Sequence, residues 1–202
     1  MSPTVIAVCG SSSGAGKSTL VKRLSEVIPN SVSLYFDAYH VTTSYPPNIY
    51  QDLAEGKNID PSLIQSPIFY RDLMSLLEGR GVTDPWNRQL KPAKYILVEE
   101  PFGKLRTGMK EIIHYLVGIE VPLDLAIARR ILRNIRTDFS HLTPDERLNY
   151  VDSFLTEYLH GGRISYQKLF EAVKNDCDIV LDGLVSIEQM TDEVITKFKI
   201  EQ

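Results

Sequence analysis

Short apolar runs alternate with amphipathic stretches along the chain. The run Val5-Ile6-Ala7-Val8-Cys9 has no polar interruption, which is typical of a strand covered on both faces. We expect further strands at residues 32–36, 95–98, 115–121 and 179–181. Five strands separated by helical segments predict an α/β fold, in which a parallel sheet has helices on both faces.

Helical spacing and capping signals mark the segments between these strands. Helices are expected at residues 20–28, 66–79, 125–135, 143–162 and 186–198. The fourth opens with a capping box, Thr143 with Glu146, and the fifth with Ser186 and Gln189. We expect Gly161-Gly162 to end the fourth helix, and the proline-rich residues 39–61 to form a loop.

Length and composition fit one globular domain. The 202 residues are 43% hydrophobic and 24% charged, which excludes disordered and fibrous classes. No apolar run is long enough to span a bilayer, and residues 1–4 lack the pattern of a secretory signal, so a cytoplasmic protein is the expectation. The net charge of −4 argues against nucleic-acid or membrane partners, whereas homo-oligomerisation stays open.

The two cysteines are too few for a disulfide framework, and neither has a neighbour at a zinc-ligand spacing. We expect Cys9 and Cys177 to be small buried side chains near strand ends.

A phosphate-binding loop of the Walker A type follows the first strand. The segment is Gly10-Ser11-Ser12-Ser13-Gly14-Ala15-Gly16-Lys17-Ser18-Thr19, and a helix follows directly. Small residues let backbone amides surround phosphates, and the helix start adds free N–H donors. Lys17 is placed to reach the outer phosphates and the Ser18 hydroxyl to ligate Mg²⁺. The pattern's first glycine, six residues before the lysine, is replaced by Ser11.

Carboxylates stand at the ends of the second and third expected strands. Ligands of such sheets bind beyond the carboxyl ends of the strands. Asp37 is placed to orient a substrate hydroxyl and accept its proton, as a kinase requires. One of Glu99 and Glu100 should face the nucleotide and hold Mg²⁺ through its water shell, since adjacent residues of a strand point to opposite sides.

A basic helix face follows the fourth strand. Arg129, Arg133 and Arg136 are spaced i, i+4 and i+7, so they share one face. A solvated surface explains such a run, but phosphoryl transfer also needs positive charge around the developing anion, often carried by a mobile lid. We favour the lid, and Arg133 above the others.

Other side chains are weaker candidates. Tyr45, Tyr50 and Trp86 lie in the irregular segments expected to wall the substrate pocket, either stacking on a base or covering the core. His40 and Arg88 are further candidates for substrate contact.

These motifs together resemble the uridine kinase and phosphoribulokinase family of P-loop small-molecule kinases. The resemblance rests on the phosphate loop, Asp37-Ala38-Tyr39, the glutamate after the third strand, Arg129-Arg130-x-x-Arg133 and Asp178 to Gly183, in that order. It implies a three-layer P-loop fold with a lid, and transfer of the γ-phosphate of ATP to a hydroxyl. By that similarity Asp37 is the catalytic aspartate, Glu100 the acidic metal-side residue, Arg129 and Arg133 the lid arginines, and Asp182-Gly183 lies near adenine.

The chain also departs from the family's pattern. Pro101 stands where many members have glycine, and Thr83 to Arg88 match the nucleoside-recognition segment poorly. These departures keep open a second hypothesis, a nucleotide-binding regulator or slow ATPase of the same fold.

The first hypothesis is an ATP- and Mg²⁺-dependent kinase that phosphorylates a small metabolite, a nucleoside such as uridine or a phosphosugar. We expect one domain over residues 1–202, with a substrate-side insert around 39–92 and a lid around 129–162. The expected site combines catalytic Lys17, Asp37 and Arg133, nucleotide-binding 12–19 and Arg129, and the metal-side residues Ser18 and Glu100.

Overall fold

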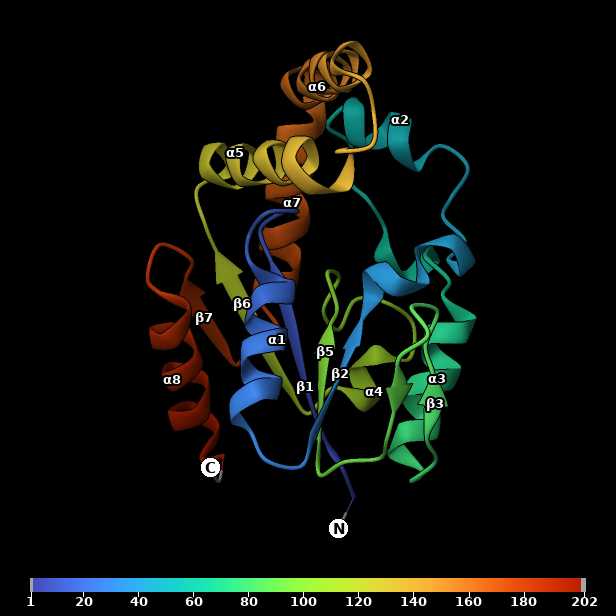
Figure 1. Cartoon of the computed structure of the whole chain (residues 1–202), viewed down its shortest axis with the longest axis vertical. Helices are drawn as coiled ribbons and strands as arrows, with labels where there is room; N and C mark the ends of the chain where they lie inside the picture. Colours follow the sequence, from blue (N-terminus) through green and yellow to red (C-terminus); the bar gives the residue numbers. More distant parts are fainter. Residues whose placement is uncertain (1, 201–202) are drawn as a thin grey trace.

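A five-stranded parallel sheet forms the centre of the computed structural model, which describes residues 2–200 (Figure 1). The strands are β1 (Thr4–Gly10), β2 (Ser31–Tyr35), β5 (Tyr95–Glu99), β6 (Tyr115–Glu120) and β7 (Ile179–Asp182), in the order β2-β5-β1-β6-β7. All neighbouring pairs are parallel. The predicted fold class is confirmed.

Helices cover both faces of the sheet. One face packs against α1 (Lys17–Val27) and α8 (Ile187–Phe198). The other packs against α3 (Pro67–Leu77), α4 (Met109–Ile112) and α7 (Arg163–Lys174). Burial on both sides explains why the strands are continuous apolar runs in the sequence.

A second group of helices lies beyond the carboxyl ends of the strands. This group comprises α2 (Ile49–Ala54), α5 (Leu123–Arg133) and α6 (Pro144–Glu157), which lie at the top of Figure 1. The expected loop at 39–61 therefore contains a helix, and it also includes parts of 3₁₀ segments at Phe36–Thr42 and Pro61–Leu63. A small hairpin, β3 (Val82–Thr83) with β4 (Gln89–Leu90), completes the strands of the described residues.

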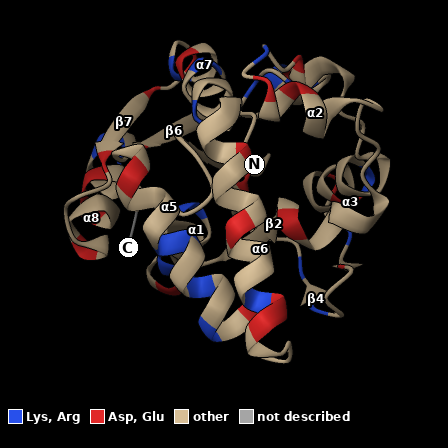
Figure 2. Ribbon diagram, turned by 90° about the horizontal axis from the view of Figure 1, so that it is seen from above, with Lys and Arg blue, Asp and Glu red and all other residues tan. Residues whose placement is uncertain are grey.

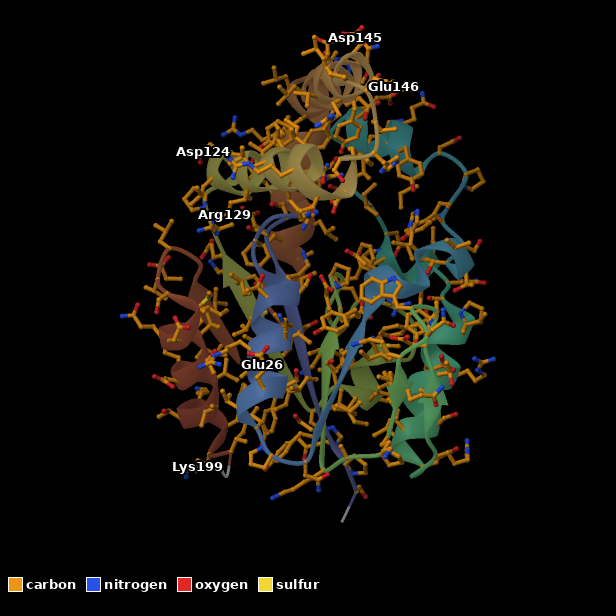
Figure 3. The ribbon with its side chains drawn as sticks, viewed as in Figure 1. Glu26, Asp124, Arg129, Asp145, Glu146 and Lys199 are labelled. Carbon is orange, nitrogen blue, oxygen red and sulfur yellow. The ribbon has the colours of Figure 1, made fainter. Side chains whose placement is uncertain are left out.

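Both predicted capping boxes are confirmed. The Thr143 side chain accepts from the Glu146 N–H and the Glu146 side chain from the Thr143 N–H, which opens α6. Ser186 and Gln189 make the same pair of bonds at the start of α8. The acidic residues that begin α6, Asp145 and Glu146, stand at the top of the molecule in Figure 3.

Gly161-Gly162 do not end a helix, so this prediction was wrong. The chain continues through a π-helical turn, Tyr158–Gly162, directly into α7. A Cβ on Gly161 would lie 2.3 Å from the Ala54 carbonyl oxygen, so the glycine lets the helix approach the backbone after α2. Ser165 and Lys168 hold the same contact: Ser165 Oγ donates to the carbonyl oxygens of Leu53 and Lys57, and Lys168 Nζ to that of Gly56.

Within residues 2–200, no helix combines the length and the apolar character that crossing a membrane requires.

Candidate active site

A cleft of about 750 Å³ opens beyond the carboxyl ends of the strands, between the sheet and the upper helices. One end is lined by the loop of residues 10–19 and Glu99, and the other by apolar side chains. Among the predicted site residues, the cleft brings together Asp37, Arg129, Arg133 and the whole of 12–19. Glu100 is not among the residues that line it.

The loop turns through two left-handed glycines. Gly14 and Gly16 have φ values of 92° and 102°, and Gly16 is the N-cap of α1. This conformation is open to glycine and strained for other residues, and it turns successive amides toward a common centre. Lys17 Nζ donates to the Ser12 carbonyl oxygen at 3.0 Å, which holds the lysine across the loop.

Ser11 fits the loop although the usual pattern has glycine there. Its backbone keeps a negative φ, so the side chain causes no strain. Its N–H donates to Ile119 O at 3.0 Å, and its hydroxyl lies within hydrogen-bond distance of both the N–H and the C=O of Val121. Ser11 thus fastens the loop entry to the end of β6.

Glu99 and Glu100 point to opposite sides of β5. Ser18 Oγ donates to Glu99 Oε1 at 2.9 Å, and Glu99 Oε2 is buried without a hydrogen-bond partner. Burial raises the pKa of Glu99, a shift that Lys17 partly opposes. An orphaned carboxylate oxygen beside a phosphate loop is the kind of ligand that a hydrated Mg²⁺ requires.

Glu100 makes a closed ion pair instead. Both its oxygens accept from the Arg106 guanidinium, with the shortest distance 2.5 Å, and both side chains are almost fully buried. The sequence-based placement of Glu100 on the metal side does not fit this geometry, because its carboxylate is already neutralised away from the cleft. Because successive side chains of an extended chain point to opposite sides, Glu99 is the glutamate that faces the cleft.

Arg129 and Arg133 of α5 reach the cleft, and Arg136 does not. Arg129 donates to the Gly183 carbonyl oxygen at 3.3 Å, and Figure 3 shows it beneath α5, facing the strand ends. Arg133 donates to Asp138 at 3.2 Å and to Ser13 Oγ at 3.4 Å. Arg136 follows in the π-helical turn Asn134–Asp138 and is exposed, outside the cleft lining. Viewed from above, basic positions mark α5 (Figure 2).

Asp37 is an exposed residue in the 3₁₀ segment after β2, and it lines the cleft. His40, three residues later, is exposed outside the lining and lies near Tyr45, with ring centroids 6.0 Å apart. Of Asp37 and His40, only Asp37 therefore lines the cleft.

The far end of the cleft is mainly apolar. Its lining comes from three separated segments and comprises Tyr45, Ile49, Tyr50, Leu53, Ile59, Pro101, Phe102, Tyr166, Leu169 and Phe170. The α7 residues were missed, although Tyr166, Leu169, Phe170 and Val173 have the spacing of a helix face, a signal that could have revealed them.

Trp86 and Arg88 lie away from the cleft. Arg88 pairs with buried Asp84, and its guanidinium lies 4.7 Å from the centre of the Tyr35 ring and 5.5 Å from that of Trp86. Both side chains are therefore engaged in packing the β3–β4 hairpin against β2, and neither lines the pocket.

Comparisons with known proteins agree with the motifs. No protein-family model matches the chain. A protein named uridine kinase from Borreliella burgdorferi is 26% identical over 189 residues, covering 88% of this chain and 85% of its own. A uridine kinase from Chlamydia pneumoniae is 24% identical over 212 residues, covering 96% and 88%.

Two solved structures share the fold. A candidate fructose transport system kinase from Silicibacter sp. TM1040 superposes with a TM-score of 0.54 at 16% identity, covering 89% of this chain and 90% of its own. A sugar kinase from Janibacter sp. HTCC2649 reaches 0.50 at 16% identity, covering 98% and 95%. The chain therefore has a phosphate loop at the end of β1 of a parallel sheet, it shares its fold with solved kinases, and its sequence is similar to those of proteins named uridine kinase.

Proposed function

We propose that this protein transfers the γ-phosphate of ATP to a hydroxyl of a small, uncharged metabolite. One observation carries the proposal: a single cleft is lined by a phosphate loop, a buried carboxylate with one unpartnered oxygen, an aspartate and a group of apolar side chains. Such an arrangement suits positioning and charge stabilisation, which are the main demands of phosphoryl transfer.

The nucleotide end has the groups that Mg·ATP requires. Amides of residues 12–19 would surround the outer phosphates, with Lys17 beside them. Ser18 and Glu99 are the residues that would hold Mg²⁺, because the Glu99 oxygen that Ser18 leaves free has no other partner. When bound, Mg²⁺ neutralises charge on the phosphate oxygens. Arg129 and Gly183 would lie near the adenine end.

Asp37 is the proposed group that orients the acceptor hydroxyl and takes its proton. Its carboxylate lines the cleft and has solvent access, through which the proton can leave. Arg133 is proposed to close over the transferring group, and residues 129–162 to serve as the lid that carries it.

The acceptor end favours a neutral molecule with a flat apolar part, such as a nucleoside. The cations in the cleft lining are Lys17, Arg129 and Arg133, and they contact the phosphate loop or Gly183. Five aromatic side chains line the cleft, namely Tyr45, Tyr50, Phe102, Tyr166 and Phe170.

The alternative of a regulator or slow ATPase is not favoured. Ser11, one of the departures that motivated it, keeps an unstrained backbone and fastens the loop to β6. The other, Pro101, contributes to the apolar lining of the cleft. Cytoplasmic location stays a prediction of the sequence, and homo-oligomerisation stays open.

The test is an acceptor screen with labelled ATP on the wild type and Asp37→Asn. We expect phosphorylation of a nucleoside but not of sugar phosphates, and a loss of about 10²-fold or more in Asp37→Asn with unchanged ATP affinity. Asp192→Asn, an exposed change on α8 outside the cleft, is the matched control. Full activity in Asp37→Asn would remove this residue from the mechanism, and the lack of any acceptor would end the kinase proposal.

A further inference from the structure

The two cysteines of the chain meet beneath the phosphate loop. Cys9 lies on β1 directly before Gly10, and Cys177 lies in the turn between α7 and β7. Their sulfur atoms are 3.6 Å apart although 168 positions separate them in sequence. Both thiols are free, Cys9 buried and Cys177 half-buried.

A glycine in the middle of a strand makes room for this contact. Gly118 on β6 is the register partner of Cys9 on one side and of Val180 on the other. A Cβ at position 118 would lie 2.9 Å from Cys177 Sγ, too close for the sulfur to stay in place. Glycine weakens a strand interior, and here it marks a close approach between neighbours. Because position 118 has no side chain, the two sulfurs can meet across β6.

The two thiols are not equivalent. The hydrogen bond with Cys9 lowers the pKa of Cys177, whereas that same contact and burial raise the pKa of Cys9. Cys177 also has the greater solvent access. The thiolate is the reactive form of cysteine, so Cys177 has the features of an attacking thiol and Cys9 those of a resolving thiol.

We propose that Cys9 and Cys177 form a reversible redox pair, which a hydroperoxide converts into an intramolecular disulfide. The Cys177 thiolate attacks one peroxide oxygen, the O–O bond breaks, and the leaving oxygen takes a proton to become water or an alcohol. The Cys9 sulfur then attacks the sulfur of the Cys177 sulfenic acid, which forms the disulfide bond and releases hydroxide. The hydroxide takes up the proton of the Cys9 thiol and leaves as water. Two thiols are oxidised by two electrons and one peroxide is reduced.

The crosslink would fasten the end of α7 to the strand that carries the phosphate loop. Cys9 sits in a strand bonded on both sides, by β5 and β6, whereas Cys177 sits in a turn. Closing the sulfur gap therefore moves the turn and α7, whose Tyr166, Leu169 and Phe170 line the cleft. Oxidation thus restrains the helix that walls the acceptor end.

The first experiment treats the folded protein with hydrogen peroxide, alkylates the remaining thiols and measures the mass. We expect a chain lighter by two hydrogen atoms, a peptide joining Cys9 to Cys177, and full reversal by dithiothreitol. Cys9→Ser and Cys177→Ser should give no internal link. Two freely alkylated cysteines after treatment, or links only between chains, would overturn the proposal.

The second experiment keeps both thiols and removes only the space between them. In Gly118→Ala the new methyl group displaces Cys177 Sγ, and we expect disulfide formation to slow by about tenfold or more. Circular dichroism establishes that the variant folds. If Gly118→Ala does not fold, the comparison is made instead with the wild type unfolded in denaturant. Unfolding separates the two cysteines, so disulfide formation should again be slower by about tenfold or more. An unchanged rate in either comparison would show that the native geometry does not direct the reaction.

The third experiment measures amide hydrogen exchange in α7 with and without the disulfide. We expect exchange in residues 170–178 to slow by about tenfold in the oxidised wild type, and not in peroxide-treated Cys177→Ser. Unchanged exchange in the crosslinked protein would overturn the restraint on α7. None of these readouts depends on kinase activity, so they stand apart from the proposed function.

Discussion

The two ends of the cleft are built in different ways. At the phosphate end, one continuous segment, residues 10–19, supplies most of the lining, and hydrogen bonds from Ser11, Lys17 and Ser18 fix it to β5, β6 and itself. At the acceptor end, apolar side chains come from residues 45–59, 101–102 and 166–170. The proposed phosphate site is thus built from local sequence, whereas the proposed acceptor site depends on how distant segments pack.

The largest effect is expected at the phosphate end. Lys17→Ala should lower kcat/KM by about 10³-fold, because the variant loses the cation nearest the outer phosphates. The matched control is Lys22→Ala, which replaces an exposed lysine of α1 that pairs with Glu26. Steady-state kinetics with Mg·ATP decide the matter, and wild-type kcat/KM in Lys17→Ala would show that the loop does not handle the phosphates as proposed.

A smaller but more discriminating effect separates the two glutamates at the end of β5, Glu99 and Glu100. Glu99→Gln should lower kcat/KM by about 10²-fold and weaken the dependence on Mg²⁺, while folding stays intact because Gln keeps an acceptor for Ser18. Glu100→Gln should instead destabilise the fold by about 3 kcal/mol, since it leaves the buried Arg106 charge uncompensated.

Urea unfolding and kinetics of the two glutamate variants, measured together, check this division. The opposite pattern, with an unstable Glu99→Gln and an inactive but stable Glu100→Gln, would return the metal-side role to Glu100.

At the acceptor end we expect a change in KM rather than in chemistry. Tyr50→Ala should raise the KM of the acceptor about tenfold and leave the KM of ATP unchanged, because Tyr50 lines only the apolar chamber. Trp86→Ala removes an aromatic ring of similar exposure outside the cleft and should change neither value. If Tyr50→Ala and Trp86→Ala changed the KM of the acceptor equally, the apolar end of the cleft would not be the acceptor site.

The smallest effect concerns pH. Burial raises the pKa of Glu99, so the carboxylate takes up a proton at a higher pH than an exposed glutamate would. As pH falls through that raised pKa, the proposed metal-side charge is lost and kcat/KM should decline by less than tenfold before the protein unfolds. The residual kcat/KM of Glu99→Gln should not show this decline at low pH.

The same raised pKa fixes the direction of the stability effect. The folded state binds the Glu99 proton more readily than the unfolded state does, so this group opposes folding once the pH exceeds its ordinary pKa. Glu99→Gln should therefore unfold at a urea concentration no lower than the wild type at neutral pH.

Much of the fold and the phosphate end could be predicted from sequence because their signals are local. Val5 to Cys9 are hydrophobic without interruption because both faces of β1 are covered. The segment 10–19 carries its own turn chemistry, and the capping boxes at Thr143 and Ser186 each span four residues.

The rest depends on contacts between distant residues. Which of Glu99 and Glu100 faces the cleft is decided by strand phase and by Arg106, six residues on. The exclusion of Trp86 and Arg88 from the pocket is decided by their packing on Tyr35. The local sequence around Gly161 predicts a helix end. The glycine is instead required because the backbone of Ala54 to Gly56, more than a hundred positions earlier, packs directly against it.

That close approach at Gly161 makes two distant parts of the chain mechanically inseparable. The helix α7, which follows α6 through the turn Tyr158–Gly162, is held to the backbone around α2 by a glycine contact, a serine and a lysine. These contacts couple a movement of α7 to the position of α2, which carries Ile49, Tyr50 and Leu53. In the proposed mechanism, a lid that closed over the nucleotide would therefore also reshape the acceptor end of the cleft.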